Sequence, residues 1–253
     1  PFRVTGQEAD STRGRANTLR RLLLAPELLR DPTTQGEIKA VMETCIGCKA
    51  CKAECPSQVD MARLKSEYLH RQHQLTGIPL RSQLFGHLKW LNHLGALTAP
   101  LSNGLLRLKP VRRLLERTVG IAASVPLPPF ARVPFDFRFH QRPSPNGERP
   151  PVILFNDCYM NYNHPEVGEA AVKVIEALGY QVIVPEQVCC GRPQLSLGLL
   201  AQAKKSAENL WTQLEPYLHP NRTARAGEDD LEPPIPVIGI EPSCVISFAD
   251  EYP

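Results

Sequence analysis

The spacing of apolar residues changes once along the chain and divides it into two parts. Before residue 125 apolar positions recur at helical intervals, and no segment alternates as a strand would, so the first part is predicted to be all-α. The expected helices span residues 8–30, 35–43, 59–73, 80–97 and 101–120. Ser11 or Thr12 is a candidate cap for the first helix, and Pro100 is expected to separate the last two.

A proline-rich stretch follows, and the pattern beyond it is different. Eight prolines fall between Pro126 and Pro151, which predicts a linker or an extended surface segment. After it, short apolar runs alternate with amphipathic segments. The expected strands are 152–155, 181–184 and 236–240, and the expected helices are 164–178 and 195–217. A polar loop is predicted over 219–234.

Alternating strands and helices predict a parallel sheet with right-handed crossovers. The chain is therefore expected to be α + α/β. It would have an all-helical domain over residues 1–125, a linker over 126–150, and a small parallel-sheet domain over 151–253.

Charge and composition exclude several classes of protein. The 253 residues include 29 Lys and Arg against 26 Asp and Glu, so no nucleic-acid-binding surface is indicated. No apolar stretch approaches the roughly eighteen residues that a membrane span needs, and no signal peptide is visible. Eight cysteines in such a chain point to metal or redox chemistry. We expect a cytoplasmic protein, at most peripheral on the inner face of a membrane.

Four of the cysteines, each at a fixed spacing, form a bacterial ferredoxin run that ends in Pro56. They are Cys45, Cys48, Cys51 and Cys55. The first three can bind one [4Fe-4S] cluster, and the fourth usually binds a neighbouring cluster. Zinc is the main alternative, although zinc more often uses two separated Cys-x-x-Cys pairs.

The first cluster needs a fourth thiolate that the ferredoxin run does not supply. Residues 1–44 contain no cysteine. We therefore expect a second run N-terminal to Pro1, whose last cysteine would complete this cluster. On this interpretation the chain is part of a longer protein.

The other four cysteines follow the three expected strands. Cys158 comes after the first strand, Cys189 and Cys190 after the second, and Cys244 after the third. These positions share the carboxyl edge of a parallel sheet, where ligands bind. Gly191 would let the backbone approach closely. A metal or cluster site is expected, with a thiol redox site or simple packing of small apolar side chains as alternatives.

Five segments resemble known iron–sulfur proteins: Ser11–Asn17, Cys48–Met61, Asp157–Pro165, Cys189–Pro193 and Glu241–Cys244. The last three are similar to the cysteine-rich CCG domain. That domain occurs in the B subunit of heterodisulfide reductase, in the C subunit of anaerobic glycerol-3-phosphate dehydrogenase, and in lactate-utilisation and glycolate oxidase iron–sulfur subunits. The first two resemble the C-terminal half of fused FAD/iron–sulfur dehydrogenases that oxidise D-2-hydroxyacids such as D-lactate or D-2-hydroxyglutarate.

The resemblance implies ligand roles for all eight cysteines. It also implies a departure from the family, because Glu241 stands where a further cysteine of the full CCG motif is expected. A non-cubane cluster with five thiolates is therefore in doubt, and a smaller cluster, a zinc ion or a redox thiol set remains open. The family usually carries two CCG copies, and one is present here, so truncation at the C-terminal side is expected.

By the same resemblance, the chain is the electron-transfer part of an FAD-linked D-2-hydroxyacid dehydrogenase. FAD and the substrate pocket would lie on another domain or subunit, and no catalytic residue is expected here. Electrons would pass through 4Fe-4S clusters to a quinone or another carrier. One alternative is a separate iron–sulfur subunit of a glycolate, lactate or glycerol-3-phosphate dehydrogenase complex, or a heterodisulfide-reductase-like subunit. Another is a zinc-stabilised module without redox activity.

Basic residues near the ferredoxin run allow two further expectations. One group is expected to form a solvated helix face or to contact a flavin domain or cluster charge, and consists of Arg13, Arg15, Arg20 and Arg21. Lys49 and Lys52 lie among the cysteines, where their charge would raise the cluster potential, weakened by solvent screening.

Overall fold

The computed structural model describes residues 2–143, 147–218 and 234–252. The polar loop predicted over 219–234 lies outside the described residues, apart from its last position. The chain divides into two compact units. The first comprises residues 1–86 and 193–201, and the second comprises residues 87–192 and 202–253.

The first unit is helical, and none of its described residues forms a strand. Its apolar core is small and gathers Leu22, Ile38, Met42 and Tyr68. Its elements are α1 (Phe2–Thr5), η1 (Glu8–Asp10), α2 (Thr12–Leu24), η2 (Pro26–Arg30), α3 (Pro32–Glu43), α4 (Ala50–Glu54), α5 (Met61–Thr76) and α6 (Leu80–Gly86), with most of α13 (Arg192–Ser196).

The helix predicted over 8–30 is shorter than expected. Ser11 caps α2 by accepting a hydrogen bond from the Gly14 amide at 2.9 Å, which confirms one of the two candidate caps. The helix ends at Leu24 because Pro26 cannot continue its hydrogen-bond ladder, and Pro26 opens a 3-10 helix instead.

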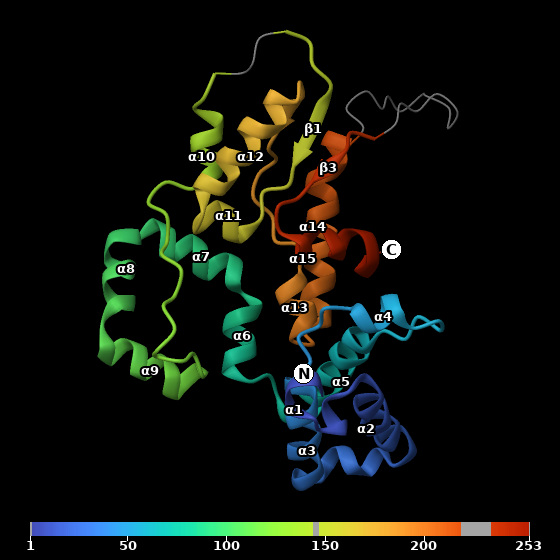
Figure 1. Cartoon of the computed structure of the whole chain (residues 1–253). Helices are drawn as coiled ribbons and strands as arrows, with labels where there is room; N and C mark the ends of the chain where they lie inside the picture. The colour runs from blue at the N-terminus through green and yellow to red at the C-terminus, as the bar shows by residue number, and fades with distance from the viewer. Residues whose placement is uncertain (1, 144–146, 219–233, 253) are drawn as a thin grey trace. The chain divides into compact units, whose positions relative to one another are not determined.

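The second unit contains all described strands and the remaining helices (Figure 1). Its elements are α7 (Leu88–Leu97), α8 (Ala99–Arg107), α9 (Lys109–Val119), α10 (Phe135–His140), β1 (Pro151–Leu154), α11 (Cys158–Tyr162), α12 (Pro165–Ala177), β2 (Gln181–Ile183), α14 (Leu200–Leu218), β3 (Val237–Ile238), α15 (Pro242–Ile246) and the π-helix η4 (Ser247–Glu251).

Proline positions move two of the predicted helix boundaries. Pro100 was expected to separate two helices, and α7 and α8 do part at Thr98. Pro100 itself lies in the first turn of α8, where a backbone amide would have no helical partner. The segment predicted as one helix over 101–120 is instead divided at Leu108. Pro110 lies in the first turn of α9 and starts a new helix in the same way.

Gly198 divides the helix predicted over 195–217 into α13 and α14. Its φ is +71°, a left-handed conformation that side chains rarely adopt. A Cβ at Gly198 would lie 2.5 Å from Cβ of Leu69 on α5, so the position also requires the absence of a side chain. A helical pattern of apolar residues continues across this break, which explains why the prediction missed it.

The strands form one parallel sheet, as predicted, and their order in it is β2-β1-β3. Alternate residues of the central strand face opposite cores, because successive strand side chains point to opposite sides. Val152 and Leu154 pack with residues of α12, whereas Ile153 and Phe155 pack with residues of α14. Helices therefore cover both faces of the sheet, and the predicted α + α/β class is confirmed.

The proline-rich stretch contributes to this core. It contains the short helix α10, whose Phe135 is only 1% exposed and packs in the cluster that includes Val172 of α12. Gly168 lies against this ring, because a Cβ there would come within 2.6 Å of Phe135.

We expect Gly168→Ala to destabilise the second unit by about 1–3 kcal/mol, since the buried Phe135 ring cannot withdraw. Gly104→Ala is the matched control. Gly104 lies on the exposed face of α8 with nothing within 4 Å, so alanine should stabilise by about 0.5–1 kcal/mol. Urea unfolding of both variants would measure these changes. Equal effects of the two substitutions would contradict the packing described.

Candidate functional site

Asp60, the residue that precedes helix α5, connects this helix to the ferredoxin run. Asp60 caps the helix by accepting hydrogen bonds from the amides of Ala62 and Arg63 at 2.9 and 3.0 Å. The same carboxylate forms an ion pair with Lys49 at 3.1 Å, between Cys48 and Cys51. Burial raises the pKa of Asp60, but the hydrogen bonds and the Lys49 charge outweigh it and keep that pKa below its usual value.

A second contact from α5 holds the beginning of the run. The Lys65 ammonium donates a hydrogen bond to the carbonyl oxygen of Cys45 at 2.6 Å. Burial lowers the pKa of Lys65, since the charged form loses hydration there. Helix α5 therefore grips the cysteine loop at Cys45 and at Lys49.

Arg15 supports the same loop from α2, and its predicted place on a solvated face is wrong. Its side chain is buried and donates hydrogen bonds to the Val41 carbonyl and to the Thr44 hydroxyl, directly before Cys45. The other three arginines of the predicted basic group are exposed as expected. The segment Ser11–Asn17 thus includes a structural anchor for the end of α3.

The expected effect of Lys49 on cluster potential needs correction. Its charge is offset by Asp60, and both side chains are only 10% exposed. A neutralised pair exerts a much weaker field on its surroundings than an isolated ammonium. Lys49 therefore acts mainly in holding the loop, and it does so from a left-handed backbone conformation with φ of 59°.

The four cysteines of the run lie at the surface of the first unit. Cys48 is exposed, and Cys45, Cys51 and Cys55 are half-buried. Positive φ values at Gly47, Lys49 and Gln58 bend the backbone through the run. These bends, together with the two contacts from α5, form a short loop around sulfur side chains that are all free thiols.

The second unit brings the other four cysteines together at the carboxyl edge of its sheet. Two of them sit on short helices that start after a strand and are capped by an acid. Asp157 caps α11, which begins at Cys158, and Glu241 caps α15, which contains Cys244. Glu241, which stands where the motif has a further cysteine, accepts hydrogen bonds from the Ser243 amide and hydroxyl. The departure from the motif thus has a structural role.

The four thiols are linked through contacts between neighbours. Sγ of Cys190 lies 3.0 Å from Sγ of Cys244, and the side chains of Cys158 and Cys189 are hydrogen-bonded. Hydrogen bonding to Cys189 and burial raise the pKa of Cys158 well above its usual value. The pKa of Cys190 is raised by its contacts with Cys189 and Cys244 and by burial. The predicted convergence of these four residues is confirmed.

Gly191 allows a close approach, as its position next to the cysteine pair predicts. Its φ is +76°, and a Cβ would lie 2.2 Å from the hydroxyl oxygen of Tyr252. That hydroxyl donates a hydrogen bond to the Cys190 carbonyl. Tyr252, carried by the turn after η4, therefore fixes the backbone beside Cys190 and was not predicted from the sequence.

Buried polar groups near the thiols lack partners. Neither side-chain atom of Asn156, two residues before Cys158, has a hydrogen-bond partner among the described residues, and the same is true of Oε1 of Gln187. Asn156 is only 1% exposed. Such groups are costly unless something bonds to them. The Asn156 amide is a donor that the sulfur atoms of an iron–sulfur cluster could use.

The donor chemistry at this edge fits a cluster. Three of these four cysteines are buried and Cys158 is half-buried. Neighbouring thiols resist ionisation because each thiolate repels the next, and bound iron would supply the compensating positive charge. Within the described ranges, no three His, Cys, Asp or Glu side chains are arranged around a single metal ion. The contacts therefore link neighbouring thiols without enclosing a single ion.

Gln187 is a further residue that the sequence did not reveal. Its amide nitrogen donates a hydrogen bond to Sγ of Cys158 at 2.9 Å. Its position two residues before Cys189 is the only signal that could have indicated it, and glutamine there has no fixed chemical meaning.

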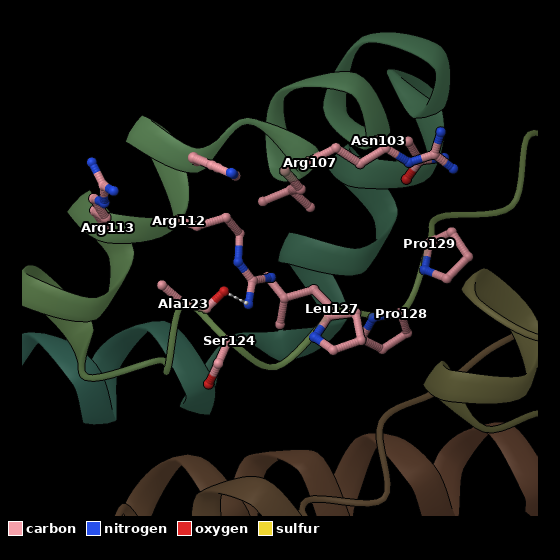
Figure 2. Close-up of a pocket in the computed structure, with 12 residues that line it drawn as sticks. Asn103, Arg107, Arg112, Arg113, Ala123, Ser124, Leu127, Pro128 and Pro129 are labelled. Carbon is pink, nitrogen blue, oxygen red and sulfur yellow. Dashed lines mark hydrogen bonds between the residues drawn. The ribbon is translucent and has the colours of Figure 1, made fainter.

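A cavity of about 700 Å³ lies away from the thiols, between α8, α9 and the segment 123–129 (Figure 2). Arg112 reaches across it and donates hydrogen bonds to the carbonyls of Ala122, Ala123 and Val125. Arg112 is buried, and its hydrogen bonds hold the turn after α9. Its presence in this cavity is therefore explained by the fold.

The comparisons with known proteins agree with these two sites. Residues 3–60 match the family model of the 4Fe-4S dicluster domain, and residues 152–248 match that of the cysteine-rich domain. The chain thus combines a match to a 4Fe-4S dicluster domain with a match to a cysteine-rich domain. Residues 3–60 contain four cysteines, whereas two cubane clusters together require eight thiolates.

The module resembles several curated oxidoreductases. It is 27% identical over 226 residues to D-2-hydroxyglutarate dehydrogenase of Haemophilus influenzae. The alignment covers 85% of the chain and 21% of that protein. It is 30% identical over 176 residues to the C subunit of anaerobic glycerol-3-phosphate dehydrogenase of Escherichia coli, covering 69% and 41%. It is 25% identical over 210 residues to a probable glycolate oxidase iron-sulfur subunit of Bacillus subtilis, covering 73% and 44%.

The module thus spans about a fifth of the length of the D-2-hydroxyglutarate dehydrogenase and less than half of the two subunits. It is an iron–sulfur electron-transfer module related to dehydrogenases and to their iron–sulfur subunits. No solved structure matches it significantly. None of the helices in the described residues is long and apolar enough to cross a bilayer.

We expect Asp60→Asn to destabilise the first unit by about 1–3 kcal/mol, because asparagine still caps α5 but leaves Lys49 without its counter-charge. Glu43→Gln is the matched control, since its pair with Lys39 is exposed and should contribute less than about 0.5 kcal/mol. Urea unfolding of the metal-free protein measures both. Similar values for the two variants would refute the role of Asp60.

We expect Gly191→Ala to cost about 1–3 kcal/mol through backbone strain and the clash with Tyr252. Tyr252→Phe removes the hydroxyl and should cost about 1 kcal/mol. The double variant should lose less stability than the sum, since the clashing oxygen is gone. Strict additivity in unfolding free energies would show that the two residues do not meet.

Proposed function

We propose that this module carries electrons from a flavin to an acceptor in a D-2-hydroxyacid dehydrogenase. The observation that carries the proposal is the gathering of four thiols at the sheet edge of a chain that also holds a ferredoxin run. The flavin and the hydroxyacid site belong to a part of the protein or a partner outside these residues.

Each thiol has a proposed role. Cys45, Cys48 and Cys51 bind one [4Fe-4S] cluster, and Cys55 binds its neighbour. A further iron–sulfur centre is held at the sheet edge by Cys158, Cys189, Cys190 and Cys244. These centres supply one-electron transfer with little ligand motion, which suits the step after a two-electron flavin.

The protein's own residues supply position and burial. Asp60 and Lys65 fix the ferredoxin loop through Lys49 and Cys45. At the sheet edge, Asp157 and Glu241 fix the helices that carry two thiols. A ligand set that is held in this way reorganises little when the charge of its cluster changes, so electron transfer is favoured.

The relatives support the substrate class. The D-2-hydroxyglutarate dehydrogenases match over 85% of the chain, which favours a D-2-hydroxyacid as the electron donor. A second candidate is a separate iron–sulfur subunit of a glycerol-3-phosphate type complex. It is favoured by the 30% identity to the C subunit of anaerobic glycerol-3-phosphate dehydrogenase.

Two predictions about organisation belong to this proposal. The folding domains are placed at residues 1–125 and 151–253, joined by 126–150. The ligand missing from the first cluster is placed on a second ferredoxin run that precedes Pro1. An extended chain with that run should bind more iron per molecule than residues 1–253.

We expect Cys48→Ser and Cys190→Ala to remove different centres from the complete protein. Cys48→Ser should abolish one [4Fe-4S] signal in electron paramagnetic resonance and leave the sheet-edge centre. Cys190→Ala should do the reverse, and should slow electron delivery to the acceptor while substrate still reduces the flavin. Each variant is the control for the other. Unchanged iron and sulfide in both variants would refute the ligand assignments.

A further inference from the structure

A cavity of about 730 Å³ opens next to the sheet-edge thiols within the second unit, and we call it the α7–α11 cavity. Residues of helices α7, α10 and α11 and of the segment after β2 line it. Its lining includes Lys89, Trp90 and His93 of α7, Phe137 of α10, Tyr162 of α11, and Gln187.

The walls of the cavity are the elements that carry the thiols. Helix α11 begins at Cys158 and ends at Tyr162, and Gln187 precedes Cys189 by two residues. The buried Gln187 lines the cavity and donates a hydrogen bond to Sγ of Cys158 at 2.9 Å. Its backbone is held by Lys89, whose ammonium donates to the Gln187 carbonyl at 3.0 Å. One side chain therefore separates the cavity from a candidate cluster ligand.

The lining combines aromatic faces with hydrogen-bonding groups. The hydroxyl of the buried Tyr162 lies 3.3 Å from Nδ1 of His93. The His93 ring is edge-on to Tyr162 and to Trp90, with centroid distances of 5.8 and 6.3 Å. Trp90 and Phe137 are 63% and 57% exposed, so the cavity presents aromatic side chains to solvent, and Asp136 and Glu186 add two carboxylates to its lining.

We propose that the α7–α11 cavity binds a quinone and is the place where electrons leave this module. A quinone is a flat conjugated ring, which suits aromatic walls, and its two carbonyl oxygens accept hydrogen bonds from groups such as Tyr162 and His93. The volume is in the range of small-molecule sites. Exposed Leu94 and Leu97 continue the apolar surface along α7, which suits an apolar tail.

Reduction of the quinone uses the electrons that the proposed function delivers. The inference therefore rests on that function. Reduction adds two electrons and two protons, so both ring carbonyls become hydroxyls. The electrons arrive singly from the sheet-edge centre. The protons come from water through the Tyr162 hydroxyl and the His93 imidazole.

Binding is tested on the complete, cluster-containing protein with an azidoquinone photoprobe and peptide mass spectrometry. Labelling is expected on peptides that include α7 or residues 135–141. Trp90→Leu should reduce it about tenfold, because an aromatic anchor is removed. Trp211→Leu is the matched control, since Trp211 is 58% exposed on α14 and does not line the cavity. Labelling elsewhere, or equal labelling in the two variants, overturns the assignment.

Electron exit is tested by reducing the same protein with dithionite and following the return of its visible absorbance in a stopped-flow instrument. Tyr162→Phe should slow reoxidation by a short-chain quinone about tenfold, since one hydrogen bond to the ring is lost. Ferricyanide, a one-electron oxidant that needs no pocket, should react at the wild-type rate.

The outcomes separate this inference from the proposed function. Reoxidation by ferricyanide but not by quinone refutes the quinone site and leaves electron transfer intact. No absorbance change with either oxidant refutes the proposed function itself. A disulfide that reoxidises the protein faster than quinone, and is slowed by Tyr162→Phe, would assign the cavity to a thiol substrate instead.

Discussion

The central physical constraint in this molecule is the cost of placing four thiols close together, three of them buried and Cys158 half-buried. Each thiolate would raise the pKa of the next, and burial raises it further, as Cys158 and Cys190 show. Such a group of thiols loses its protons readily only when a bound metal such as iron supplies positive charge. The sheet, the two acidic helix caps and the close approach at Gly191 all serve to bring these thiols together.

The ferredoxin run faces the opposite problem, because its cysteines are neighbours in sequence and lie at the surface. Here the difficulty is to hold a short loop in one shape. Helix α5 does this with one of its own side chains, Lys65, and with its cap residue Asp60, and Arg15 adds support from α2. Asp60 has two roles here, because its single carboxylate caps helix α5 and neutralises Lys49.

The sheet-edge site and the α7–α11 cavity share their supporting elements, which gives the second unit a direct connection between thiols and solvent. Gln187 and helix α11 belong to both. A change in charge at Cys158 would therefore alter the electrostatic environment of the cavity through the hydrogen bond from Gln187 to Cys158. This arrangement would link the proposed redox centre to the proposed binding site without any large movement of the chain.

The sequence by itself determined the features that depend on neighbours along the chain. The cysteine spacings indicated the iron–sulfur chemistry, and the alternation of apolar runs indicated a parallel sheet, because period and spacing are local properties. It also placed Cys158, Cys189, Cys190 and Cys244 at one edge, since parallel strands end on the same side. Only the tertiary structure decided which side chains meet. The burial of Arg15, the pairing of Lys49 with Asp60, the contact of Tyr252 with Cys190, and the place of Gln187 beside Cys158 join residues that are distant in sequence or carry no distinctive pattern. The break at Gly198 belongs with these, because the close approach of Leu69 on another helix makes glycine necessary there.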